Sequence, residues 1–225
     1  MKKYYSNGKL LLTGEYVVLD GALALAVPTK LGQSLEVKRT DSLYINWKSL
    51  DHNNSLWFEA SFDAATFQSQ DNNPVAKRLK SILTAARSLN ENFLKSSSGY
   101  DVITKLDFPE NWGLGSSSTL INNIANWADI DAYELLEKTF GGSGYDIACA
   151  SNNSAITYQI NNEIRQVTEV NFKPTFIEQL FFIHLNEKQN SRKGISHYNL
   201  NKRSISDEIA AISEITNKIL TCSSL

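Results

Sequence analysis

A glycine- and serine-rich segment at residues 109–119 carries the strongest local signal for chemistry. It reads Pro-Glu-Asn-Trp-Gly-Leu-Gly-Ser-Ser-Ser-Thr and lies between a predicted strand and a predicted helix. Gly113 and Gly115 let the backbone approach a ligand closely. The hydroxyl groups that follow stand where a helix begins, beside N–H groups that favour an anion such as phosphate, and a hydroxyl there can also bind Mg²⁺. The alternative interpretation is an ordinary loop that ends in a serine cap.

Two further segments place a charged side chain beside glycine. Residues 141–148 read Gly-Gly-Ser-Gly-Tyr-Asp-Ile-Ala, and an aspartate held after such a turn can accept a proton from a substrate hydroxyl. Residues 8–16 place Lys9 and Glu15 at the two ends of an apolar run, where a lysine favours an anionic partner. Taken singly, each segment is also compatible with a purely structural turn or a solvated strand end.

Several other kinds of site are not supported. Position 3 is lysine, so Gly8 and Lys9 do not complete a Walker loop, and no glycine pair completes the dinucleotide-binding pattern. The serine run lacks the second glycine of the hydrolase nucleophile motif. The three histidines, His52, His184 and His197, do not have metal-ligand spacing. Cys149 and Cys222 are too few for a disulfide framework.

The elements that must position these residues are read from hydrophobic periodicity. Alternation and short apolar runs predict strands in the first third of the chain, at residues 10–12, 17–19, 23–27, 35–38, 43–47 and 56–62, and later at 100–106, 155–160, 164–170 and 180–185. Apolar spacing of 3.6 residues predicts helices over residues 75–89, 120–128 and 206–219, with a short helix that begins after Asp131. Ser206, Asp207 and Glu208 are expected to cap the last helix.

Length and composition indicate an α/β or α+β protein with a substantial core. The 225 residues allow one large or two small domains at about 150 residues each, and 42% are hydrophobic. Because 22 basic residues face 24 acidic ones, a general nucleic-acid-binding role is not expected. No apolar run reaches the roughly 18 residues of a membrane span, and no secretory signal fits, so we expect a cytoplasmic location.

The three segments, in this order, resemble the GHMP kinases, the family of galactokinase, homoserine kinase, mevalonate kinase and phosphomevalonate kinase. Residues 8–27 are similar to the family's first motif, and residues 109–119 to its second, P-x-x-x-G-L-G-S-S-A-S. Residues 143–146 are similar to the S-G-x-D segment of the mevalonate kinases. The likeness is strongest to the mevalonate and phosphomevalonate kinase branch. The Gly-Tyr-Asp-Ile-Ala run suggests a bacterial subgroup.

This resemblance implies an α+β fold and two domains. A ribosomal-protein-S5-like ATP-binding domain is expected over residues 1–172, and an incomplete ferredoxin-like domain over residues 173–225. The family's third, glycine-rich motif is not found before Leu225, so we expect a C-terminal segment to be missing. The implied activity is transfer of the γ-phosphoryl group of ATP to a hydroxyl or phosphate acceptor, with mevalonate or phosphomevalonate first. A diphosphomevalonate decarboxylase-like enzyme and a non-catalytic ligand-binding relative are the alternatives.

The resemblance also assigns roles to individual residues. Asp146 would accept or orient the acceptor's proton, with Lys9 close enough to lower its pKa. The ATP phosphates would contact the segment Gly113, Leu114, Gly115, Ser116, Ser117 and Ser118, and Ser117 would bind Mg²⁺. Substrate would contact Glu15 and Tyr16, and also Lys188, Ser191 and Arg192 after the predicted strand at 180–185. The expected partners are ATP, Mg²⁺ and a small molecule, without nucleic acid or membrane, in a monomer or homodimer.

Overall fold

The computed structural model describes residues 1–95, 98–185 and 191–222, and for Ser191 and Arg192 only the backbone. The first half of the chain contains β1 (Lys2–Leu11), η1 (Val17–Asp20), β2 (Ala24–Thr40), β3 (Tyr44–Leu50), β4 (Leu56–Asp63), α1 (Pro74–Leu89) and β5 (Gly99–Leu106). The second half contains η2 (Glu110–Trp112), α2 (Ser116–Ala128), α3 (Ala132–Thr139), α4 (Tyr145–Ser151), β6 (Ile156–Asn161), β7 (Ile164–Glu169), η3 (Ile177–Gln179), α5 (Ser191–Asn201) and α6 (Ser206–Thr221).

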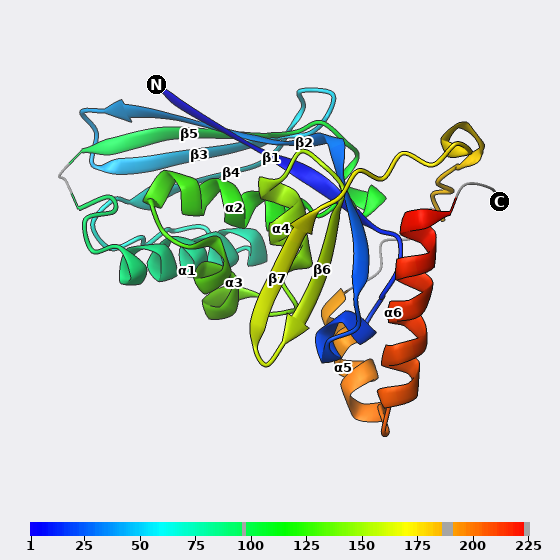
Figure 1. Cartoon of the computed structure of the whole chain (residues 1–225). Helices are drawn as coiled ribbons and strands as arrows, with labels where there is room; N and C mark the ends of the chain where they lie inside the picture. Colours follow the sequence, from blue (N-terminus) through cyan, green and yellow to red (C-terminus); the bar gives the residue numbers. More distant parts are fainter. Residues whose placement is uncertain (96–97, 186–190, 223–225) are drawn as a thin grey trace.

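One mixed sheet organises the molecule around the long strand β2. The strand order is β4-β3-β5-β2-β6-β7, and β1 also pairs with β2 in antiparallel register. The 17 residues of β2 let its first part pair with β6 and its last part with β5. β3 and β5 are parallel, and the other pairs are antiparallel. β2 therefore connects the sheet to the β6–β7 hairpin, which Figure 1 shows extending away from the other strands.

Helices α1, α2 and α3 lie together on one side of the sheet (Figure 1). Asn73 begins α1, because its side chain accepts a hydrogen bond from the Ala76 N–H and Pro74 follows at the first helical position. The main core lies between these helices and the sheet, and its fully buried members include Ile45, Phe62, Ile82, Leu83, Ile121 and Ile124. The α+β fold class expected from the sequence is confirmed.

Most elements predicted from periodicity are present, with four corrections. The two strands predicted at residues 23–27 and 35–38 are parts of the single strand β2. Residues 17–19 form a 3-10 helix, whereas a strand was predicted. Residues 180–185 are not a strand; they run without regular structure, and Phe181, Ile183 and Leu185 are more than 80% exposed. An apolar run of this kind forms a strand only when neighbouring strands supply hydrogen bonds and cover its faces. The predicted side-chain cap of α6 is also wrong, because Ile205 precedes that helix and gives no such hydrogen bond.

The last helix returns to the segment that follows β1. The Thr216 side chain is fully buried, its hydroxyl donates to the Leu23 carbonyl at 2.8 Å and it lies 2.8 Å from the Thr13 hydroxyl. The Ser213 hydroxyl accepts from the Leu23 N–H at 3.0 Å. These bonds place α6 beside the beginning of β2, as Figure 1 shows. In the described part of the chain, no helix has both the length and the apolar character needed to cross a membrane.

Candidate active site

One cavity, of about 570 Å³, is lined by residues from all three motif segments. Lys9 reaches it from β1, Ser117 from the beginning of α2 and Asp146 from the beginning of α4. The other predicted residues on its wall are Glu15, Tyr16, Gly113, Gly115, Ser116 and Ser118. Segments more than a hundred residues apart in the sequence thus form a single site.

The loop before α2 has the geometry of an anion-binding helix start. Gly115 has a φ of 89°, in the left-handed region that favours glycine, and α2 begins directly after it without a side-chain cap. Ser116, Ser117 and Ser118 all line the cavity, and the Ser118 hydroxyl donates to the Gly115 carbonyl at 2.8 Å. The first N–H groups of a helix have no partner within the helix and carry the positive end of its dipole. This arrangement can hold a phosphate group.

Strand β1 fixes the position of this loop. The backbone N–H of Lys9 donates to the Leu114 carbonyl at 3.0 Å. Gly8 permits the approach, because a Cβ there would lie 2.9 Å from the same carbonyl and 2.5 Å from the Thr29 hydroxyl. Leu114, which was predicted to contact phosphate, is buried in an apolar cluster with Leu106 and Phe108 and is not on the cavity wall. Its side chain anchors the loop.

Asp146 is held in a desolvated position near Lys9. Burial raises the pKa of its carboxyl above the usual value, and the opposing effects of the Lys9 ammonium and of the Ile147 N–H do not cancel that rise. We predicted that Lys9 lowers this pKa; its interaction has that sign, but the net shift is the reverse because desolvation is larger. Within the described residues, Lys9 forms no ion pair, and its ammonium donates to the Tyr145 hydroxyl at 2.7 Å.

The turn before Asp146 is attached to the β6–β7 hairpin. The Ser143 carbonyl accepts a short hydrogen bond from the Tyr158 hydroxyl and another, at 3.3 Å, from Arg165 Nε. Arg165 also forms an ion pair with Glu137 of α3 at 2.6 Å. Gly144, with a φ of 91°, lies against the Tyr133 ring and Arg165, so that a Cβ there would approach both within 3.2 Å. These contacts fix the direction in which α4 begins.

Helix α5 contributes to the cavity wall next to Tyr16. Tyr16, which has a φ of 59°, stacks on Tyr198 with 5.7 Å between ring centroids. Gly194 lies directly against the Tyr16 ring, and Ile195 lines the cavity. Ser191 and Arg192 form the first turn of α5, but their side chains, like the whole of Lys188, lie outside the described part of the chain. Their predicted contact with substrate stays a prediction.

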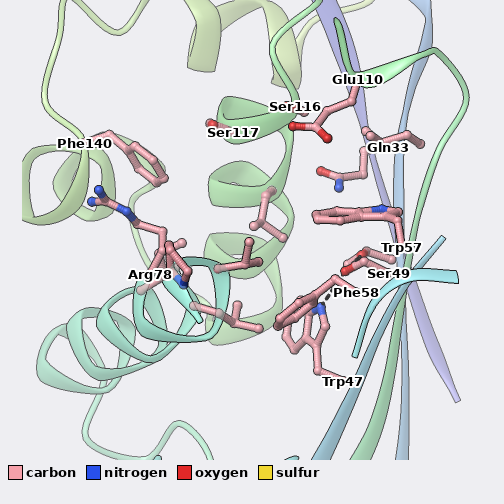
Figure 2. A pocket seen from close by; sticks show the side chains of 17 residues that line it. Gln33, Trp47, Ser49, Trp57, Phe58, Arg78, Glu110, Ser116, Ser117 and Phe140 are labelled. Atoms are coloured by element: carbon pink, nitrogen blue, oxygen red, sulfur yellow. Dashed lines mark hydrogen bonds between the residues drawn. The ribbon is translucent and has the colours of Figure 1, made fainter. Parts of the chain in front are cut away.

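A second cavity, of about 330 Å³, adjoins the first at the start of α2. Glu110, Ser116, Ser117 and Phe140 line both cavities. Figure 2 shows Trp57 and Gln33 on one side of this second cavity and Arg78 and Phe140 on the other. The Arg78 guanidinium lies 5.0 Å from the centre of the Phe140 ring. The cavity is largely apolar, with a few polar groups, as is usual for a small-molecule site.

Sequence reasoning missed Trp57, Arg78, Glu110, Tyr145 and Ile195 as cavity residues. Trp57 on β4 and Arg78 on α1 lie outside the three motif segments. The pairing of β4 with β3 and of β3 with β5, and the packing of α1, bring them to the loop. Glu110 and Tyr145 lie inside the motif segments, so their position in a motif was a signal that could have identified them as site residues.

Comparison with solved structures identifies the class of fold. A mevalonate kinase structure matches all of this chain over 74% of its own, with a TM-score of 0.68 and 14% identity. The Streptococcus pneumoniae phosphomevalonate kinase in complex with phosphomevalonate and AMPPNP matches over 99% of this chain and 74% of its own, with a TM-score of 0.67 and 16% identity. The chain therefore has the fold of the GHMP kinases, and the resemblance indicated by its motifs is confirmed.

Sequence comparison points to the same group. The galactokinase of Clostridium perfringens (strain 13 / Type A) is 23% identical over 237 residues, which cover 97% of this chain. The chain spans 59% of the length of that relative. No family model matches the chain.

Proposed function

We propose that the protein is an ATP-dependent small-molecule kinase that transfers the γ-phosphoryl group to a hydroxyl or phosphate acceptor. The observation that carries this proposal is the convergence of Lys9, the start of α2 and Asp146 on one cavity. Phosphoryl transfer requires mainly positioning and charge stabilisation, and these three groups supply a cation, a phosphate cradle and a proton acceptor. The fold and the likeness to a galactokinase support the same activity.

The two cavities suggest how ATP would lie. The triphosphate would occupy the start of α2, where Gly115, Ser116 and Ser117 face the larger cavity. The base would enter the smaller cavity beside Trp57, because that cavity is apolar and shares Ser116 and Ser117 with the phosphate site. The acceptor would lie at the other end of the larger cavity, between Asp146 and Tyr16.

The residues present are compatible with Mg²⁺. In phosphoryl-transfer sites this ion is usually held by one or two protein groups together with the phosphates. Ser117 offers a hydroxyl, and Glu110 adds a carboxylate that sequence reasoning did not single out. Bound there, Mg²⁺ would neutralise charge on the phosphate oxygens. Glu137 of α3 is also acidic, but it forms an ion pair with Arg165 and is not assigned to Mg²⁺.

For the acceptor, we propose a class of small molecules that carry a hydroxyl or phosphate group, and not one compound. Mevalonate and phosphomevalonate are suggested by the motifs, and a sugar by the galactokinase likeness. The test is ADP release from ATP·Mg²⁺ with mevalonate, phosphomevalonate, galactose and homoserine, with diphosphomevalonate added to detect release of CO₂. Turnover with one acceptor, accompanied by its phosphorylated product, supports the kinase. ATP binding without turnover on any acceptor would contradict it and favour a non-catalytic relative.

Replacement of Trp57 by alanine tests the position of the base. Stacking of a base on an aromatic side chain contributes about 1–3 kcal/mol, so ATP binding should weaken by about 5- to 150-fold. The measurement is a calorimetric titration with ATP·Mg²⁺. Tyr44→Ala is the control, because Tyr44 is an aromatic residue of the same sheet, is exposed to a similar degree, 53% against 43%, and lines neither cavity. Equal affinities of both variants and the unaltered protein would exclude the smaller cavity as the base site.

We also propose that residues 173–225 begin a second, ferredoxin-like domain. Phe181, Ile183 and Leu185 are apolar and more than 80% exposed, and Phe182 between them is 67% exposed. A contiguous exposed apolar stretch of this kind is the surface that a further layer of structure would cover.

A further inference from the structure

Tyr145 lines the larger cavity and lies between Gly144 and Asp146 in the sequence, and the function proposed above gives it no role. It is the first residue of α4, and its side chain is on the cavity wall with Lys9 and Asp146. Tyr145 occupies the x position of the S-G-x-D pattern, for which the pattern specifies no residue type. The structure, in contrast, gives its hydroxyl a specific partner.

That partner is the Lys9 ammonium, 2.7 Å from the Tyr145 hydroxyl oxygen. An ammonium can only donate, so the phenol oxygen accepts this bond and its own proton remains for another acceptor. Among the residues that the structure describes, no hydrogen bond uses that proton. Burial raises the pKa of Tyr145 well above its usual value, so the phenol stays protonated at neutral pH. The positive charge of Lys9 polarises the O–H bond and makes it a stronger donor.

The Lys9 side chain places this phenol close to the phosphate loop. Lys9 runs past Gly115 so closely that a Cβ there would lie 3.0 Å from Lys9 Cγ and 3.5 Å from Lys9 Cε. The ammonium therefore extends from the loop toward α4, where it meets Tyr145. A phosphoryl group held at the start of α2 and moving toward an acceptor near Asp146 would pass beside this pair.

We propose that Tyr145 is a catalytic residue that donates its O–H to an oxygen of the transferred phosphoryl group, together with Lys9. The bond from phosphorus to the ADP oxygen breaks as the bond to the acceptor oxygen forms, and the acceptor's proton moves to Asp146. Tyr145 keeps its proton throughout. Its hydrogen bond strengthens as negative charge builds on the phosphoryl oxygens, so it stabilises the transition state more than the ground state.

The proposal rests on the kinase function above, and its test separates the two. Tyr145→Phe and the unaltered protein are titrated with ADP·Mg²⁺ alone and with ADP·Mg²⁺ plus aluminium fluoride, which mimics the phosphoryl group in transfer. We expect unchanged ADP affinity and about 10- to 100-fold weaker binding of the fluoride complex, the usual effect of losing a hydrogen bond to a charged group. Tyr133→Phe is the control, because Tyr133 packs against Gly144 and is not on the cavity wall.

A double-mutant cycle with Lys9→Met distinguishes direct donation from positioning of Lys9. If Tyr145 only holds Lys9, Tyr145→Phe has no further effect once Lys9 is replaced; direct donation predicts a further loss. Equal binding of the fluoride complex by Tyr145→Phe and the unaltered protein would overturn the proposal and leave the kinase function standing. Failure of the unaltered protein to bind ADP·Mg²⁺ or the fluoride complex would overturn both.

Discussion

Replacement of Asp146 by asparagine is expected to lower the rate of phosphoryl transfer by about 10²- to 10⁴-fold, the usual contribution of a general base. The amide has nearly the same shape and can still accept from the Ile147 N–H, which lies 3.1 Å from the Asp146 carboxylate. It cannot take the acceptor's proton. The measurement is the rate of ADP release under saturating ATP and acceptor. A variant that keeps its turnover would remove Asp146 from the mechanism.

The same substitution is expected to raise the unfolding temperature at neutral pH. Burial raises the pKa of Asp146 in the folded state, so between its unfolded and folded pKa values the folded protein binds more protons. Stability therefore falls as the pH rises through this window, and above it the full cost of the buried charge is present. Asparagine does not ionise and avoids that cost. The difference in unfolding temperature should be largest at neutral pH and vanish in acid.

Asp20→Asn provides the opposite control. Although burial tends to raise the pKa of Asp20, hydrogen bonds from Lys202 at 2.6 Å and Tyr198 at 2.5 Å hold it below its usual value. This carboxylate stabilises the fold above its unfolded pKa, and that stabilisation is lost as the pH falls through the folded pKa. Asp20→Asn should thus unfold at a lower temperature at neutral pH. Shifts of the same sign in both variants would refute the assignment of a buried, costly charge to Asp146.

The raised pKa of Asp146 also predicts the pH dependence of the reaction. A protonated carboxyl cannot accept the acceptor's proton, so the rate should fall as the pH is lowered through that pKa. The fall should begin at a higher pH than for an ordinary aspartate. A rate that stays constant down to the usual aspartate range would show that another group accepts the proton.

Local sequence signals were sufficient to predict those elements whose start or turn depends on their own residues. Asn73 and Pro74, an N-cap residue followed by proline, start α1 just before the predicted helix at residues 75–89, and Asp131 caps α3 by accepting from the Tyr133 and Glu134 N–H groups. The glycines of residues 113–115 and 141–144 were recognised because the left-handed conformations that they adopt are costly for other residues. The residues that line the larger cavity were therefore largely predictable from motif order.

Features that depend on long-range packing could not be predicted in this way. Asn122 and Asn123 lie off the apolar stripe of α2, where periodicity predicts a solvent-facing side, yet both are buried. The Asn122 amide donates to the Ser6 hydroxyl, and Asn123 bonds to the same hydroxyl and to the Gln33 carbonyl, each at 2.9 Å. Periodicity cannot distinguish a solvent-facing polar stripe from one that bonds to a neighbouring strand. The cavity beside Trp57 was missed for a related reason, because no local pattern links β4 to the phosphate loop.

Replacement of Gly115 by alanine is expected to destabilise the protein by about 1–3 kcal/mol, through its left-handed backbone, and to displace the phosphate loop. The new Cβ would lie 2.7 Å from the Ser118 hydroxyl and 3.0 Å from Lys9 Cγ, so either the loop or Lys9 must move. A displacement of about 1 Å at a catalytic group can reduce the rate about 100-fold. The measurements are the free energy of unfolding in urea and the rate of ADP release.

Gly113→Ala separates the two causes. Gly113 has a φ of 73°, and a Cβ there would meet no heavy atom within 4 Å, so this variant carries the backbone strain without the collision. Compared with Gly115→Ala, Gly113→Ala should lose a similar free energy of unfolding but keep much more of the rate of ADP release. Adding Ser118→Ala to Gly115→Ala removes one of the two colliding groups and should restore part of the rate. Equal losses of activity in Gly113→Ala and Gly115→Ala would mean that the left-handed backbone of the loop, and not its close approach to Lys9, is what the reaction requires.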